Sequence, residues 1–274
     1  MKTINPSELS PMQVQMILQT AVSPRPIALA STIDKNGNVN LSPFSFFNLF
    51  SSNPPILIFS PARRVRDNST KDTLHNVLEV PEVVIGNVNF DMVQQVSLSS
   101  TEYETGVDEF IKSGLTKKPA ELVKPPLIAE SPVNFECKVI EVKPLGNEGG
   151  AGNLVICEVL KIHIREEFLN EEGNLDQKKL DLVSRLGGNW YGRTTAETLF
   201  EVPKPLVTKG IGFDQLPSEI KNSKIFTGND LGMLANVEQL PEGNFSADEK
   251  VHLEAQKLLL EGKIEEAWKV LLTQ

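Results

Sequence analysis

Short runs of apolar and β-branched residues, separated by polar turns, recur along most of this 274-residue chain. Such runs predict strands at 27–33, 39–50, 56–60, 82–89, 132–142 and 153–165. Up to residue 205, helical periodicity is limited to the segments 8–21, 72–80, 91–99 and 107–111. Many short strands with few helices favour a mainly β fold, a β-barrel with peripheral helices, over a βαβ sheet.

The first two predicted strands flank Asn36-Gly37, a dipeptide that tolerates the positive φ angles of a type I′ hairpin turn. The second strand is unusual in composition. Its central residues are Ser42, Pro43, Phe44, Ser45, Phe46 and Phe47. Proline cannot donate a hydrogen bond to a sheet, so the ladder is interrupted here. The residues alone leave two interpretations open: backbone contact with a flat polar ligand, or a bulged edge strand that binds nothing.

A basic cluster precedes the helix predicted at 72–80, and it consists of Arg63, Arg64, Arg66 and Lys71. The start of a helix attracts anions through its free N–H groups and its dipole, so this region could hold one phosphate group. The structural alternative is a solvated loop followed by simple capping, with Ser69 or Thr70 as the expected cap.

Several motifs in order resemble the flavin reductase-like family of FMN-binding split barrels. They are segment 24–64, Lys71-Asp72-Thr73, 106–110, Gly114-Leu115, Phe135-Glu136-Cys137 and Arg185-Leu186-Gly187-Gly188. The resemblance covers residues 12 to 205 and implies an FMN cofactor, with FAD and riboflavin as alternatives.

The resemblance also implies a site and an activity. Ser42, Pro43, Phe44, Ser45, Phe46 and Phe47 would contact the edge of the flavin ring. Ser60, Arg63, Arg64, Lys71, Asp72 and Thr73 would lie at the phosphate. No catalytic side chain is assigned, because a flavin itself performs hydride and electron transfer. The implied activity is NADH- or NADPH-dependent flavin reduction, with a monooxygenase as a candidate recipient of reduced flavin. The alternative is an FMN-binding electron carrier that receives electrons from a protein partner and does not oxidise NAD(P)H.

Two further segments allow alternatives. Trp190 and Tyr191 could cover a flavin ring or seal the barrel; similar proteins are usually homodimers with flavin near the interface, so this segment could act across it. The glycine-rich segment 146–152 leads into a strand and lacks GxGxxG, so it is interpreted as a flexible hairpin loop.

Composition excludes several classes of function. A net charge of −9 argues against nucleic-acid binding. The chain has no apolar run long enough for a bilayer and begins without a signal-peptide pattern, so we expect a cytoplasmic protein with no membrane association. Cys137 and Cys157 are expected as buried free thiols. The scattered His75, His163 and His252 predict no metal site.

We expect a domain boundary near residue 205. Residues 1–205 form the split-barrel domain, and 206–274 form a C-terminal extension. Within it, 203–244 is predicted as an extended arm, and Ser246–Glu249 as a capping box that starts a helical hairpin. This hairpin, with helices to 261 and over 263–272, resembles one tetratricopeptide unit, which cannot bury its own face. We expect it to pack on the chain's own dimer, or alternatively to recruit a monooxygenase.

Overall fold

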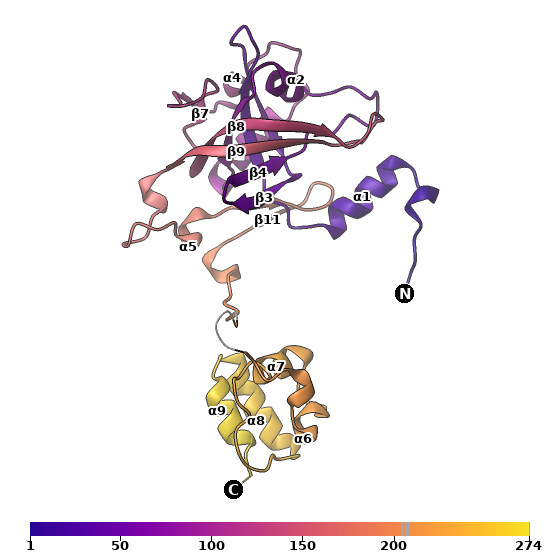
Figure 1. Cartoon of the computed structure of the whole chain (residues 1–274), viewed down its shortest axis with the longest axis vertical. Coiled ribbons are helices and arrows are strands. Elements are labelled where there is room, and N and C mark those ends of the chain that lie inside the picture. The colour runs from indigo at the N-terminus through magenta and orange to yellow at the C-terminus, as the bar shows by residue number, and fades with distance from the viewer. Residues whose placement is uncertain (204, 206–208, 274) are drawn as a thin grey trace. The chain divides into compact units, whose positions relative to one another are not determined.

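The computed structural model describes residues 1–203, 205 and 209–273. The chain forms two compact units, Met1–Phe200 and Glu201–Gln274, and each is described by itself (Figure 1). The first unit is built on one antiparallel sheet of seven strands, ordered β2-β1-β5-β8-β9-β4-β3. In chain order these are β1 (Ala28–Ile33), β2 (Val39–Phe44), β3 (Phe47–Ser52), β4 (Pro55–Phe59), β5 (Glu82–Asn87), β8 (Val133–Pro144) and β9 (Asn153–Ile164). The predicted mainly β fold with peripheral helices is confirmed.

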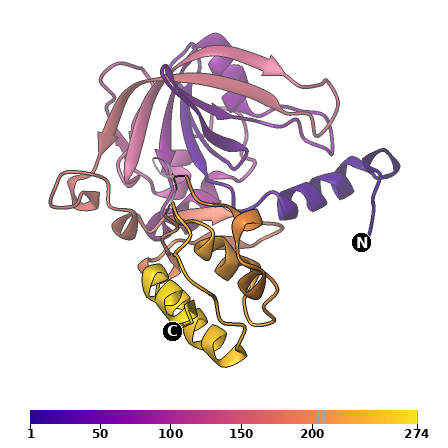
Figure 2. The same ribbon diagram turned by 60° about the horizontal axis from the view of Figure 1, so that its bottom comes forward.

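The region expected to be one strand at 39–50 is in fact two strands, β2 and β3. They form opposite edges of the sheet. Ser45 and Phe46 carry the chain from one edge to the other, and the carbonyl of Phe46 accepts a hydrogen bond from Ser60 N at 2.8 Å. The seven strands curve strongly as they pass between these edges (Figure 2). The aromatic and hydroxyl-rich stretch therefore lies where the sheet folds back on itself.

The first hairpin forms as expected, but its turn is not type I′. Only Gly37 has a positive φ, at 86°. The carboxylate of Asp34 accepts 2.8 Å bonds from the N–H groups of Asn36 and Asn38. The side chain thereby stabilises a longer loop in which only the glycine takes the left-handed conformation.

Short helices and two small hairpins surround the sheet. The helices are α1 (Pro11–Ala21), α2 (Asp72–Glu79), α3 (Val93–Ser99), α4 (Glu109–Ser113) and α5 (Gln177–Leu180). The small hairpins pair β6 (Lys117–Lys118) with β7 (Leu127–Ile128), and β10 (Val183–Arg185) with β11 (Tyr191–Arg193). Helix α4 begins later than the predicted 107–111, because the carboxylate of Asp108 caps it by accepting from Phe110 N.

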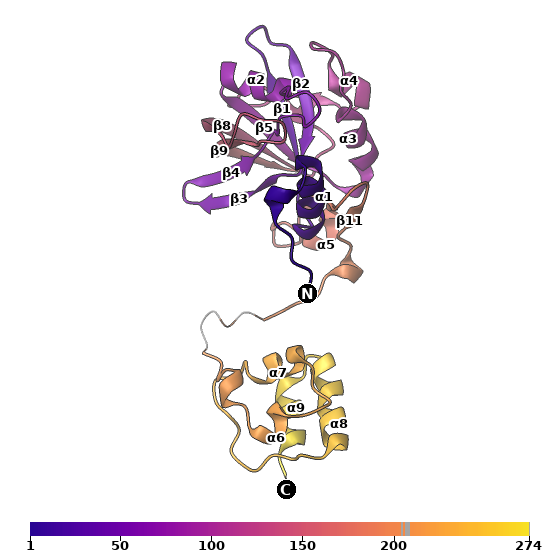
Figure 3. The same ribbon diagram turned by 90° about the vertical axis from the view of Figure 1, so that its right-hand side faces the viewer.

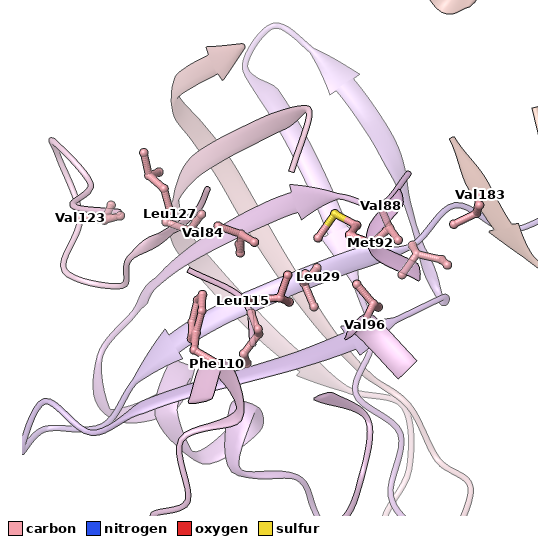
Figure 4. Close-up of a cluster of buried hydrophobic side chains, with 13 residues drawn as sticks. Leu29, Val84, Val88, Met92, Val96, Phe110, Leu115, Val123, Leu127 and Val183 are labelled. Atoms are coloured by element: carbon pink, nitrogen blue, oxygen red, sulfur yellow. The ribbon is translucent and has the colours of Figure 1, made fainter. Parts of the chain in front are cut away.

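Two hydrophobic clusters lie on the two faces of the sheet. One joins α2 residues such as Leu74 to Phe59 and Cys157. The other joins Leu29 to α3 and α4 residues, including Val96 and Phe110 (Figure 4). Both faces are therefore covered at the centre of the sheet, with α2 on one side and α3 and α4 on the other (Figure 3). This explains why all six residues of β1 are buried. Cys137 and Cys157 are free buried thiols, as predicted.

Helix α1 differs from the others because none of its residues is buried. It extends from the sheet (Figure 2) and exposes a set of apolar side chains, namely Met12, Met16, Ile17 and Leu18. The side chain of Arg25 attaches its C-terminal end to the sheet. Its guanidinium donates to the carbonyls of Val22 (2.7 Å) and Leu186 (3.0 Å), and also to the carbonyl of Gln19.

The second unit is helical where an extended arm was predicted at 203–244. Its helices are α6 (Ser218–Lys221), α7 (Gly228–Leu234), α8 (Glu249–Leu260) and α9 (Ile264–Leu271). Side chains from the supposed arm, including Ile220 and Leu234, form one buried cluster with Leu259 and Trp268. The helical hairpin thus buries its apolar face within its own unit, because α6 and α7 supply the missing cover. Residues 204 and 206–208 of the predicted arm lie outside the described part.

The predicted capping box of α8 is also wrong. Asp248 is the N-cap, and its carboxylate accepts from Lys250 N at 2.8 Å. The hydroxyl of Ser246 instead accepts from Asp248 N at 3.1 Å. The two side chains therefore accept from different N–H groups, and Asp248, which directly precedes the first helical residue, is the cap.

Candidate functional site

A small polar hollow, called here the anion pocket, lies where β2, α2 and the loop after α3 meet. Residues 63–66 are called here the arginine-rich segment. Together, β2, this segment and the start of α2 line the pocket with Asn40, Ser42, Arg64, Lys71, Asp72 and Thr73. From the end of α3 to α4 it is lined by Ser99, Ser100, Thr101, Glu102, Tyr103 and Glu109. Two cations and several hydroxyl groups therefore converge from segments that are far apart in sequence.

Helix α2 begins at this pocket without a side-chain cap. Its N-cap is Lys71, whose side chain cannot accept a hydrogen bond. The predicted caps have other partners: Ser69 Oγ accepts from Arg64 at 2.9 Å, and Thr70 Oγ1 lies 2.7 Å from a ring nitrogen of His75. The expectation that Ser69 or Thr70 caps the helix is therefore wrong. An uncapped helix start beside a lysine and an arginine fits a phosphate group.

The ammonium of Lys71 is held over the second strand. Its Nζ donates to Ser42 Oγ at 3.0 Å and lies 5.1 Å from the centre of the Phe44 ring. Burial, with Arg64 close by, lowers the pKa of Lys71 from its ordinary 10.5. The charge is thus incompletely compensated by the protein, which favours binding of an anion.

A chain of hydrogen bonds braces the pocket from α4 to α2. The buried carboxylate of Glu109 accepts from Leu41 N and from Asn40 Nδ2, both at 2.9 Å. The amide oxygen of Asn40 accepts from Thr73 Oγ1 at 2.7 Å. Burial raises the pKa of Glu109. Since three elements are joined by these bonds, the shape of the pocket is set before any ligand enters.

A larger hollow, called here the groove, lies between α1 and the arginine-rich segment and has a volume of about 1030 Å³. Apolar side chains of α1, among them Met12 and Leu18, line one side. Phe46, which is 40% exposed, and Arg63 lie among the residues of the other. The groove adjoins the anion pocket, because Arg64 and Glu102 line both hollows.

The glycine-rich segment is the hairpin loop between β8 and β9, as predicted. It supports the arginine-rich segment through backbone bonds, from Gly150 N to Arg63 O at 2.9 Å and from Arg63 N to Ala151 O at 2.8 Å. A Cβ atom on Gly149 would lie 3.0 Å from Arg64 O. The two backbones therefore approach so closely that a larger residue at this position would make the neighbouring backbone shift.

The structure divides the residues expected at a flavin site into three sets. Ser42, Arg64, Lys71, Asp72 and Thr73 line the anion pocket. Phe46 and Arg63 line the groove. Pro43, Phe44, Ser45, Phe47 and Ser60 line neither hollow.

The third set supports the other two. Phe44 is buried, with its ring centre 5.2 Å from that of Phe59 and the two rings tilted by 38°, and Phe47 packs against the same cluster. Ser45 Oγ accepts a 3.4 Å bond from Arg25. Trp190 is 76% exposed within the first unit, so it does not seal the sheet.

Several pocket residues were not anticipated from the sequence. These are Asn40, Ser99, Ser100, Thr101 and Glu102. A signal was available for the hydroxyl residues, because a Ser-Ser-Thr run follows the helix predicted at 91–99. No local pattern indicates that this run meets Lys71, since they are joined only through the tertiary fold.

Among the described residues, no group of three His, Cys, Asp or Glu side chains could hold a metal ion. No helix in the described ranges is long and apolar enough to cross a membrane.

Similarity to known proteins shows the family of this chain. A sequence profile described as "Flavin reductase like domain" matches residues 21–181. This chain belongs to the flavin reductase-like family. An uncharacterized protein of Halalkalibacterium halodurans is 38% identical over 208 residues, which cover 75% of this chain and 98% of that protein.

Solved structures of this family share the fold. Nitrilotriacetate monooxygenase component B from Bacillus cereus is 27% identical with a TM-score of 0.68, and the match covers 74% of this chain and 98% of that one. A flavin reductase structure with a split-barrel domain from Shewanella frigidimarina has a TM-score of 0.61 at 23% identity, covering 72% of this chain and 95% of that one. The curved sheet of this family member is thus a split barrel, and the protein is a flavin-related oxidoreductase.

Proposed function

We propose that this family member binds FMN across the anion pocket and the groove, and catalyses reduction of flavin by NADH or NADPH. The observation that carries the proposal is the uncapped start of α2, with Lys71 and Arg64 beside it. A terminal phosphate monoester fits this combination of charge and free N–H groups. FAD and riboflavin remain the alternative flavins.

The residues of the chain bind and orient the cofactor. Arg64 and Lys71 provide the charges for the phosphate, and the N–H groups at the start of α2 provide uncharged donors. Phe46 borders the part of the groove proposed for the ring. When bound, the flavin supplies the hydride and electron chemistry, which accounts for the lack of an assigned catalytic side chain.

We further propose that the protein is a homodimer in which a second copy covers α1 and the groove. The exposed apolar side chains of α1 support this, since a contiguous uncovered patch of this kind is typical of an interface. The sheet adds exposed Leu49 and Phe50 of β3, and Leu160 and Ile162 of β9. The Trp190–Tyr191 segment is proposed to act near the same interface.

The recipient of reduced flavin is proposed to be a monooxygenase. The similarity to a protein described as a monooxygenase component B supports this assignment. The second candidate is an FMN-binding electron carrier. It would use the same flavin site, so the two functions differ only in whether NAD(P)H is oxidised.

An anaerobic visible absorption spectrum of the purified protein with bound FMN tests the proposal. Bleaching of the flavin bands by NADH or NADPH is the expected result. Bands that persist with both nucleotides but bleach with dithionite would assign the protein as an electron carrier. Failure to take up FMN at all would contradict the flavin site.

A further inference from the structure

The hollows proposed for the flavin phosphate and ring meet at the ion pair of Arg64 and Glu102. Arg64 and Glu102 are the two residues that line both the anion pocket and the groove. Glu102 Oε1 accepts from Arg64 Nε at 2.9 Å, and Glu102 Oε2 accepts from Arg66 Nη2 at 3.0 Å. Building on the proposed flavin site, we infer that Glu102 is a gate: a bound phosphate displaces its carboxylate from Arg64.

The contacts of Arg64 indicate which partner moves. Its Nη1 donates to Ser69 Oγ at 2.9 Å and to the carbonyl of Thr70 at 3.0 Å. These bonds hold the guanidinium at the pocket from one side, while Glu102 occupies the other. Only 25% of the Arg64 side chain is exposed, against 50% of the Glu102 side chain. The carboxylate can therefore turn into solvent while the guanidinium stays in place.

The chemistry of the two ligands of Arg64 is alike. A carboxylate and a phosphate both accept charge-assisted hydrogen bonds from a guanidinium. Within the protein, Glu102 thus takes the place of the anion that Arg64 would otherwise bind. When Glu102 leaves, Arg66 keeps its second partner, since its Nη2 also lies 3.0 Å from Asp67 Oδ2. The gate therefore lowers the affinity for phosphate-bearing flavins and leaves riboflavin unaffected.

The test is a comparison of dissociation constants for FMN and riboflavin in the wild-type protein, Glu102→Gln and Glu102→Ala. Exposed ion pairs contribute little each, so loss of both should tighten FMN binding by about 3- to 30-fold. Riboflavin, which has no phosphate, should change by less than about 2-fold. High salt should reduce the difference between wild type and variants, because it screens the exposed pair.

Glu104→Gln is the matched control. Glu104 lies on the same loop, carries the same charge and makes no ion pair within the described residues. It should shift the FMN constant by less than about 2-fold. If FMN binds wild type but Glu102→Gln binds it equally or more weakly, the gate is wrong and the flavin site stands. Equal tightening for riboflavin would also overturn the gate. No FMN binding by wild type would instead overturn the proposed function.

Discussion

The anion pocket and the groove meet at Arg64 and Glu102, but they are built in different ways. In the pocket, side chains from β2, α2 and α4 are joined by hydrogen bonds through Glu109, Asn40 and Thr73. The groove has α1 as one wall, and that helix buries none of its residues. The pocket is complete within one chain, whereas the groove has an apolar wall that nothing in the first unit covers. In the proposed function, recognition of the phosphate therefore precedes assembly, while binding of the ring depends on a second copy.

Reversing the charge of Lys71 tests the pocket most directly. Lys71→Glu should weaken FMN binding by about 100-fold or more, because a negative charge then faces the phosphate in a half-buried site. Riboflavin binding should change by only a few-fold. Fluorescence titration with both flavins measures the difference. Lys118→Glu, on the exposed strand β6, is the control and should leave both constants unchanged. Unchanged FMN affinity in Lys71→Glu would contradict the phosphate assignment.

Loss of Arg25 should destabilise the attachment of α1 and with it the groove. Arg25→Gln leaves several carbonyls without their charged donor, so the free energy of unfolding should fall by about 2–4 kcal/mol. Urea denaturation measures this change. Lys35→Gln removes an exposed ion pair instead and should cost less than about 1 kcal/mol. If both variants lose the same free energy of unfolding, Arg25 does not anchor α1 as described.

A charge on α1 should break the proposed dimer and leave the pocket intact. Leu18→Lys places an ammonium on the apolar wall of the groove, where Leu18 is 55% exposed. Sedimentation should show a shift from dimer to monomer, with the fold retained by circular dichroism. Leu260→Lys, at an 80% exposed position of α8, is the control and should remain dimeric. A wild-type monomer would refute the dimer before any variant is made.

The smallest expected effect is a pH dependence from Lys71. Its pKa is lowered from 10.5, so the folded protein releases this proton before the unfolded chain does. As pH rises through the lowered pKa, this group adds to the free energy of unfolding, because the cost of the buried charge disappears. FMN affinity should fall over the same range, because only the ammonium attracts the phosphate. Titration with FMN and riboflavin separates this loss from ionisation of the flavin ring, which both share.

A Lys71→Arg variant sharpens the measurement. Arginine keeps its charge across this range, so its FMN affinity should stay level while that of wild type declines. A parallel decline in both proteins would assign the pH dependence to another group.

The second unit shows where reasoning from local patterns fails. Segment 209–244 has short apolar groups divided by Gly, Pro and Asn, and these look like an irregular arm. Its Ile220, Phe226 and Leu234 nevertheless form a core with α8 and α9. Each short helix of this segment has too few residues to show a helical periodicity in its apolar positions. Only packing against the two longer helices, α8 and α9, stabilises it.

The sequence by itself determined the strands of the barrel, most of its helices and the family. The alternation of apolar and polar residues and the order of motifs are properties of neighbouring residues, so they can be read directly from the linear sequence. Only the tertiary structure decided that β2 and β3 are separate edges, that α2 starts without a cap, and that Ser99–Thr101, Glu102 and Glu109 join Lys71. These features depend on contacts between residues far apart in the chain, for which a linear pattern carries no signal. Ionic partners such as Arg64 and Glu102 are likewise chosen by where the backbone places them, because charge alone is compatible with many pairings.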